Sequence, residues 1–195
     1  SACAVAPKER EDGDPYCGML PEAVIRSAIY SGWSSCSLKR LGEPALHNGL
    51  PDAARQMIRF TFTEGHGTVF RTVTITEHLN GTGELRVQGT RRRRDYRDAA
   101  SYIVPRRVAL SAEDVARIDR LGAEAGAWDY AVGTWDEKEE IYLHCQLLEM
   151  ERASEAGYRF SSVNIGCNQP QKLMPLVNEI VRLAGMRQTH PQLFE

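Results

Sequence analysis

The chain has 195 residues, of which 42% are hydrophobic and 26% are charged, and this composition is typical of a globular protein with one folded core. Its 24 basic and 26 acidic residues give a net charge of −2, so no overall positive field favours nucleic acid or an anionic membrane surface. No apolar run reaches the ~18 residues that a membrane-spanning helix needs. We therefore expect a partner other than nucleic acid.

The first 20 residues are polar and irregular. They contain Pro7, a charged run, and the turn-forming sequence Gly13-Asp14-Pro15, which is typical of a terminal segment without regular structure. We interpret residues 1–20 as an N-terminal tether and residues 21–195 as a single domain.

The first expected element is a short helix over Leu20–Tyr30. Pro21 suits the first helical position, and the apolar residues between Val24 and Ile29 repeat along one side. Gly32 is expected to end this helix. A segment of small residues and a loop rich in proline and glycine then lead to the strands.

Four strands are predicted next, because apolar and polar residues alternate with a period of two. Gly65-His66-Gly67 and Asn80-Gly81 have the composition of hairpin turns. Pro105 has no backbone N–H to donate, which favours an edge position for the last strand. The four strands are expected at residues 58–63 and 69–77, around Leu85 and Val87, and at residues 102–109.

The second half predicts a helix, a hairpin and a closing helix. Ser111 is a good N-cap and Gly126 a good terminator for the first helix. Alternating strands at Ile141–Leu147 and Tyr158–Ile165 form a hairpin centred near Ser154, with Cys145 about opposite Asn164. The last helix runs from Leu173 to Ala184, with Pro175 in its first turn and Gly185 after its end.

This order of elements predicts an α+β fold. An antiparallel sheet, made of the four-strand meander and the C-terminal hairpin, is expected with helices packed on it. The closing helix should cover the last hairpin and bury a common set of apolar side chains, namely Leu143, Leu147, Ile165, Leu176 and Ile180.

Five cysteines form an odd set, at positions 3, 17, 36, 145 and 167. Without Cys3 near the terminus, four remain, which suffices for two disulfides in an oxidising compartment. Hairpin register favours Cys145 with Cys167, and proximity in sequence favours Cys17 with Cys36. The alternative is a set of buried thiols in a cytosolic protein.

Ser1-Ala2-Cys3 resembles the end of a bacterial lipobox, in which small residues precede the cysteine that becomes lipidated. The chain shares three features with the small periplasmic lipoproteins that serve as inhibitors or immunity partners of exported enzymes, and it resembles them in this respect. These features are the lipobox-like sequence, the tether and the expected disulfides. The resemblance implies lipidation at Cys3, a periplasmic location with outer-membrane anchoring, and contact with the membrane only through that lipid.

Two charged stretches are candidate contact surfaces for a protein partner. Arg91 and Arg93 belong to a basic run at a strand end, which either protects a sheet edge in solvent or binds an acidic partner. The acidic run that follows Trp135 is either a solvated turn or part of an interface with the nearby aromatic residues. The second stretch, which we rank higher, comprises Trp128, Tyr130, Trp135, Asp136, Glu137 and Glu139.

The sequence contains no motif that assembles a catalytic or metal site. The five histidines show no pair at helical ligand spacing, and Gly32-Trp33-Ser34-Ser35-Cys36 lacks the second glycine of a nucleophile elbow. We therefore expect no cofactor and a non-enzymatic binding function. The alternatives are an envelope hydrolase with an unrecognised site and a structural envelope lipoprotein.

Overall fold

The computed structural model describes residues 16–27, 31–64, 66–94, 97–129, 145–167, 169–190 and 193–194. The strands of its main sheet are β1 (Ala54–Thr63), β2 (Val69–His78), β3 (Gly83–Arg91), β4 (Ser101–Leu110), β5 (Leu147–Ser154) and β6 (Gly157–Asn164). The remaining elements are α1 (Glu22–Ser27), α2 (Ser31–Arg40), the short 3-10 helix η1 (Leu46–Asn48), α3 (Ala112–Ala125), α4 (Met174–Leu183), β7 (Gln188–His190) and β8 (Leu193–Phe194).

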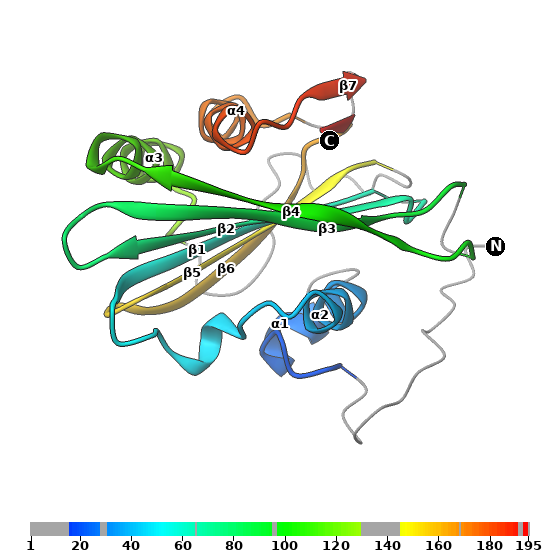
Figure 1. Cartoon of the computed structure of the whole chain (residues 1–195), viewed down its shortest axis with the longest axis horizontal. Helices are drawn as coiled ribbons and strands as arrows, with labels where there is room; N and C mark the ends of the chain where they lie inside the picture. The colour runs from blue at the N-terminus through cyan, green and yellow to red at the C-terminus, as the bar shows by residue number, and fades with distance from the viewer. Residues whose placement is uncertain are drawn as a thin grey trace.

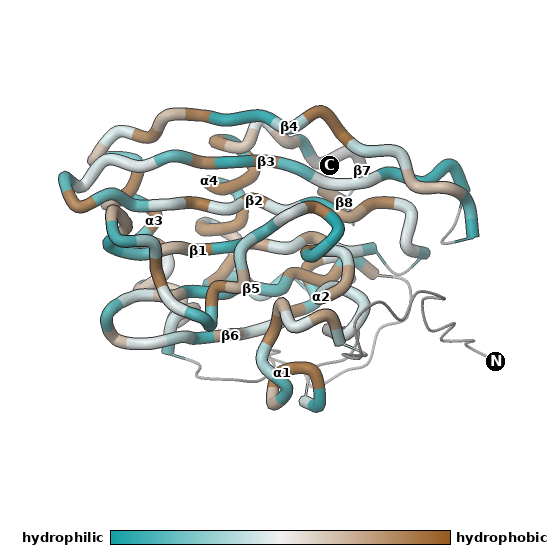
Figure 2. The backbone as a smooth tube through the Cα atoms, turned by 60° about the horizontal axis from the view of Figure 1, so that its bottom comes forward, coloured by the Kyte–Doolittle hydropathy of each residue, from teal (hydrophilic) through white to brown (hydrophobic). Residues whose placement is uncertain are grey.

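The six main strands form one antiparallel sheet in the order β4-β3-β2-β1-β5-β6. Helices α3 and α4 lie over one face of this sheet, and α1 and α2 lie over the other (Figure 1). Figure 2 shows the strands side by side, with α1 and α2 in front. The α+β prediction is confirmed: the meander and the hairpin share one sheet because β5 pairs with β1.

Strand β4 lies at the sheet edge, as the single proline in it predicts. Gly89 pairs with Ile103, whereas Val87 pairs with Arg106, so two residues of β4 face one residue of β3 at Pro105. This irregularity is a β-bulge, a device that limits further strand pairing along an exposed edge.

Helix α2 was not predicted, and its presence is the main difference in the N-terminal half. We expected one helix that Gly32 would end; instead α1 stops at Ser27, and Gly32 lies inside a second helix. The serines and glycine of α2 have low helix propensity. Tertiary contacts stabilise it, because Ser35 accepts a hydrogen bond from the Met19 N–H (3.1 Å) and Trp33 packs edge-on against Phe70.

Both predicted disulfides are present. Cys17 and Cys36 are bonded with Cα atoms 5.0 Å apart, and this bond ties the chain before α1 to the middle of α2. Met19 and Leu20, which the sequence analysis places in the tether, are 8% and 3% exposed. They pack with Val24 in an apolar cluster beneath the sheet.

The hairpin of β5 and β6 forms, but its register differs by two residues from the prediction. Leu147, rather than Cys145, pairs with Asn164. This shift places Cys145 beside Cys167, and the two form the second disulfide with Cα atoms 5.6 Å apart. Residues 141–144 of the expected strand lie outside the described residues.

The main apolar core lies between the sheet and the helices α3 and α4. Ile165, Leu176 and Ile180 are fully buried there, as predicted. Leu147 is only partly buried, and Leu148 occupies the core face in its place. The prediction for Leu147 was wrong because both faces of β5 are covered, so alternation did not determine which residues face this core. Leu143 is not among the described residues.

The opposite face carries two smaller apolar clusters, which lie between the sheet and the segment with α1, α2 and η1. The members of the first are Met19, Leu20, Val24, Leu38, Phe70 and Phe160, and those of the second are Leu46, Ala54, Met57 and Ala153. Buried polar and charged side chains, including Glu43, Arg59 and Glu151, are also part of the structure on this side of the sheet. None of the helices in the described part of the chain is long and apolar enough to span a membrane.

Truncation of Ile180 to Ala should test the packing of α4. Its side chain is fully buried, so the variant should lose about 2–5 kcal/mol of unfolding free energy in urea. Asn178→Ala changes an exposed residue on the same helix and should stay within about 0.5 kcal/mol of wild type. Equal small losses in the two variants would mean that α4 is peripheral to the core.

Candidate functional site

One row of side chains crosses five strands on the sheet face that α1 and α2 cover. The register places Arg59 opposite both Glu151 and Thr74. Further along, Thr74 lies opposite Arg86, and Arg86 lies opposite Arg107. Residues directly opposite in neighbouring strands present their side chains on the same face. We refer to Glu151, Arg59, Thr74, Arg86 and Arg107 as the charged row.

Glu43 reaches this row because of the way α2 ends. Gly42 adopts a φ of +66°, the left-handed conformation that glycine accepts most readily. The Gly42 N–H donates to the Lys39 carbonyl (3.0 Å), and the Glu43 N–H donates to the Leu38 carbonyl (3.1 Å). This pair of bonds is the Schellman pattern of a helix C-terminus. It turns the chain so that Glu43 lies directly against the sheet.

The Glu43 carboxylate is fully buried and receives hydrogen bonds at both oxygens. Thr72 donates to Oε1 (3.0 Å) and Thr74 to Oε2 (2.9 Å). Gln88 also donates to Oε1 (2.5 Å), and Arg86 to Oε2 (2.9 Å). A buried charge is tolerated only when it is paired and hydrogen-bonded in this way. The sheet face therefore forms a receptor for one carboxylate, which the protein itself supplies.

Arg59 is the buried cation at the centre of the network. Its guanidinium donates to Glu151 Oε2 through Nε (2.6 Å) and to the Pro44 carbonyl (2.7 Å), and Nη2 lies 2.5 Å from the same Glu151 oxygen. Its Nη1 is also 3.8 Å from Glu43. Arg59 thus joins the segment after α2 to strand β5.

Burial raises the pKa of both Glu151 and Tyr158, at the acidic end of this network. Desolvation raises the pKa of Glu151, while the charge of Arg59 and hydrogen bonds from Arg59 and Tyr158 oppose that rise. Burial and the neighbouring Glu151 raise the pKa of Tyr158 far above its usual value. Tyr158 therefore stays a neutral donor, and its hydroxyl bonds to Glu151 Oε1 (3.0 Å).

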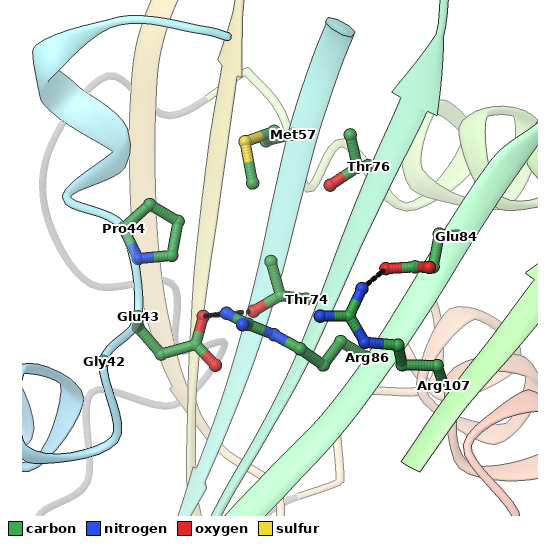
Figure 3. Close-up of a pocket in the computed structure, with 9 residues that line it drawn as sticks. All are labelled: Gly42, Glu43, Pro44, Met57, Thr74, Thr76, Glu84, Arg86 and Arg107. Atoms are coloured by element: carbon green, nitrogen blue, oxygen red, sulfur yellow. Dashed lines mark hydrogen bonds and ion pairs between the residues drawn. The ribbon is translucent and has the colours of Figure 1, made fainter. Parts of the chain in front are cut away.

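A hollow of about 310 Å³ lies beside the part of the charged row that contains Thr74, Arg86 and Arg107. In Figure 3 the segment with Glu43 and Pro44 forms one wall, and the side chain of Arg86 extends from β3 across the sheet toward Glu43. Arg107 points into the same space and pairs with Glu84 (2.6 Å). The lining residues are Gly42, Glu43, Pro44, Met57, Thr74, Thr76, Glu84, Arg86 and Arg107.

The edge strand next to this hollow carries large exposed apolar side chains. Tyr102 is 67% exposed and Val104 is 87% exposed. Arg91, which pairs with Ser101, and Arg93 just beyond β3 are exposed at the same end of the sheet. We refer to Arg91, Arg93, Tyr102, Val104 and Arg107 as the β4 edge surface. Two of its arginines are residues that the sequence analysis proposed for partner contact.

Trp128 does not lie on an exposed surface, contrary to the expectation that it would provide an interface aromatic. It is 9% exposed, its ring is 6.1 Å from that of Phe60, and the Arg152 guanidinium lies over it at 5.6 Å. Gly122 makes room for this ring, because a Cβ there would come within 2.0 Å of the indole nitrogen. Residues outside the described ranges include Cys3, Tyr130, Trp135, Asp136, Glu137 and Glu139.

A second hollow, of about 300 Å³, contains residue types that catalysis can use, including His47, Ser154 and Tyr158. The Nδ1 atom of His47 is buried without a hydrogen-bond partner, and the Ser154 hydroxyl accepts a bond from the Ala156 N–H in its own turn. These contacts do not pair a nucleophile with a base. Within the ranges that the structure describes, no three His, Cys, Asp or Glu residues are placed to hold a metal ion.

Sequence reasoning missed the buried members of the charged row. Arg59 alternates with Ile58 and Phe60, so the period-two pattern marked it only as a polar position of its strand. Glu43, which bonds to the row from outside the sheet, lay in a predicted loop. Gly42 marks the end of α2 and so fixes the place of the next side chain, but this signal can be read only once α2 is known, and the sequence did not predict that helix. Comparison of the chain with models of known protein families and with curated proteins finds no match.

Replacing Arg59 with Met should show how the buried charges depend on one another. The variant leaves Glu151 buried without its cation, so its unfolding free energy should fall by about 3–5 kcal/mol at neutral pH. Arg59 opposes the rise that burial causes in the pKa of Glu151, so this pKa should rise further in the variant, and protonation at low pH then removes the unpaired charge. The loss should therefore shrink as pH falls.

The double variant Arg59→Met, Glu151→Met removes both members of the pair. It should unfold at a higher urea concentration than Arg59→Met alone, since apolar side chains of similar volume often replace a buried ion pair without loss. The single variant Glu151→Met completes the cycle. If the losses of Arg59→Met and Glu151→Met simply add up to the loss of the double variant, the two residues do not interact.

Proposed function

We propose that this protein is a non-enzymatic periplasmic binding protein of bacteria that acts as an inhibitor or immunity partner of an exported enzyme. The observation that carries the proposal is the β4 edge surface, where Tyr102 and Val104 are exposed on the strand that also carries the exposed Arg107 and that pairs with the end of β3 near Arg91 and Arg93. Exposed aromatic side chains and arginines are the residue types that supply most of the affinity in protein interfaces.

Location in the periplasm is part of the same proposal. Two disulfides join Cys17 to Cys36 and Cys145 to Cys167, and such bonds persist in oxidising compartments. The small residues Ser1 and Ala2 before Cys3 are those of a lipobox-like sequence, and on this basis the proposal includes lipidation at Cys3 and anchoring at the outer membrane.

Partner contact at this edge would be made by side chains rather than by an added strand. Pro105 has no N–H to donate, and the bulge beside it interrupts the ladder. The arginines favour a partner with an acidic contact region, because opposite charges speed the encounter and fix its orientation. The apolar pair would then supply the buried part of the contact.

Affinity capture from an envelope extract of the producing cells tests this function. The immobilised protein should retain one stoichiometric enzyme, and titration with the free protein should reduce the activity of that enzyme. The variant Tyr102→Ser, Val104→Ser should lose about tenfold or more in affinity, because it removes two exposed contact side chains at once.

Leu79→Ser provides a matched control, since Leu79 is also a large exposed apolar residue, at 71%, but lies at the β2–β3 turn. This variant should bind as wild type does, and neither variant should change the melting temperature appreciably. Equal binding by all three proteins would show that the β4 edge surface is not the contact. A captured enzyme that keeps full activity would contradict the inhibitor function.

A further inference from the structure

The hollow beside the charged row has the chemistry of a binding site for one more carboxylate. Its volume of about 310 Å³ is at the lower end of the roughly 300–1,000 Å³ found for small-molecule sites. It therefore suits a side chain or a small anion better than a cofactor. Pro44 and Met57 provide apolar contact, and the remaining lining is polar.

The groups that remain available in the hollow are mainly donors. A guanidinium carries five N–H donors and no acceptor. Arg86 uses Nη2 on Glu43, and Arg107 uses Nη1 on Glu84, so both retain further N–H groups. Thr76 adds a hydroxyl to the lining. A ligand rich in acceptor oxygens is the best chemical match to such a surface.

The charge balance favours a monoanion. Glu43 and Glu84 offset the two arginines of the hollow, so the two carboxylates repel a phosphate dianion more strongly than they repel a monoanion. A single carboxylate needs only the donors of Arg86 and Arg107. It can replace the Arg107–Glu84 pair, whose side chains are 65% and 40% exposed and whose contact in water is weak.

Arg86 is positioned before any ligand arrives. Its side chain is only 24% exposed and is held by the fully buried Glu43, which in turn is bonded to Thr72, Thr74 and Gln88. Positioning by the protein lowers the entropy that a ligand must remove on binding. The buried carboxylate thus orients one side of the site.

The hollow shares its face of the sheet with Tyr102. On β3, Thr90 pairs with Tyr102 and Arg86 pairs with Arg107, and residues four apart on a strand point to the same side. At about 3.3 Å per residue, the two pairs are about 13 Å apart along β3. A partner segment of a few residues spans that distance, so one partner can contact both places.

We infer that the hollow binds the carboxylate of an acidic side chain of the protein partner, between Arg86 and Arg107. This inference rests on the proposed function and specifies one contact that holds the partner. The partner would place an Asp or Glu in the hollow while neighbouring side chains pack on Tyr102 and Val104. Arg107, which belongs both to the hollow and to the β4 edge surface, would connect the two contacts.

Titration of the full chain with a blocked glutamate, N-acetylglutamate N-methylamide, tests the site without the partner. Backbone amide signals of Thr76, Arg86 and Arg107 should shift and saturate in the millimolar range. The isosteric blocked glutamine should give no saturable shift, because it lacks the charge that strengthens bonds to guanidinium.

Two neighbouring arginines supply the matched variants. Arg107→Gln should weaken binding of the blocked glutamate about tenfold, since a hydrogen bond to a charged group is lost. Arg106→Gln should leave it within about twofold, because Arg106 pairs with Val87 and reaches the Leu183 carbonyl on the opposite face. Both arginines are exposed, so neither change should prevent folding.

Equal shifts with the blocked glutamine, or equal losses in the two arginine variants, would overturn the carboxylate site. Tighter binding of N-acetylalanine, whose carboxylate is terminal, would overturn the assignment to an acidic side chain. The captured partner separates this inference from the proposed function. If the partner binds Arg107→Gln as tightly as wild type, the inference that a partner carboxylate binds in the hollow is wrong, while the proposed binding function stands.

Discussion

The packing of α2 against the sheet depends on the hydrogen bonds and ion pair of the buried Glu43 carboxylate. A charge with no exposed surface is unfavourable unless the protein surrounds it with donors, and here Thr72, Thr74, Gln88 and Arg86 provide them. Because these donors come from β2 and β3 while Glu43 follows α2, the contact fixes the helix to the sheet. It also fixes the wall of the hollow, since Gly42, Glu43 and Pro44 form that wall. The contacts of Glu43 therefore both hold α2 on the sheet and form one wall of the candidate binding site.

Exposure rises steadily along the charged row, and this gradient connects the core to the surface. The side chain of Arg59 is fully buried, that of Arg86 is 24% exposed, and that of Arg107 is 65% exposed. The buried members are held by several contacts each, whereas Arg107 has a single solvated pair with Glu84 that contributes little to stability. The outer end of the row is thus available to a partner while the inner end stays rigid. An interface on β4 would use side chains that this network has already oriented.

Much of the fold was predictable because alternation and turn residues act locally. The meander, the edge position of the strand with Pro105 and both disulfides followed from those signals, and the structure contains them. Helix α2 was not predictable from its serines, because burial and the bond to Cys17 stabilise it. The register of β5 was missed because the hairpin was centred near Ser154, whereas the turn lies at Glu155 and Ala156. Glu149 and Glu151 are both buried, and Glu151 lies opposite Arg59. The charged row depends on pairing across five strands, so no local pattern could reveal it.

Native-state hydrogen exchange of Glu43→Gln tests the central role of the buried carboxylate most directly. The amide group of Gln must set its NH₂ against either the Gln88 or the Arg86 donor, so the segment after α2 should open more often. The amides of residues 42 and 43, which bond to Lys39 and Leu38, should exchange about tenfold faster or more, while those of the β1–β2 ladder change little. Unchanged exchange at residues 42 and 43 would contradict the account, because it would show that the carboxylate does not hold this segment on the sheet.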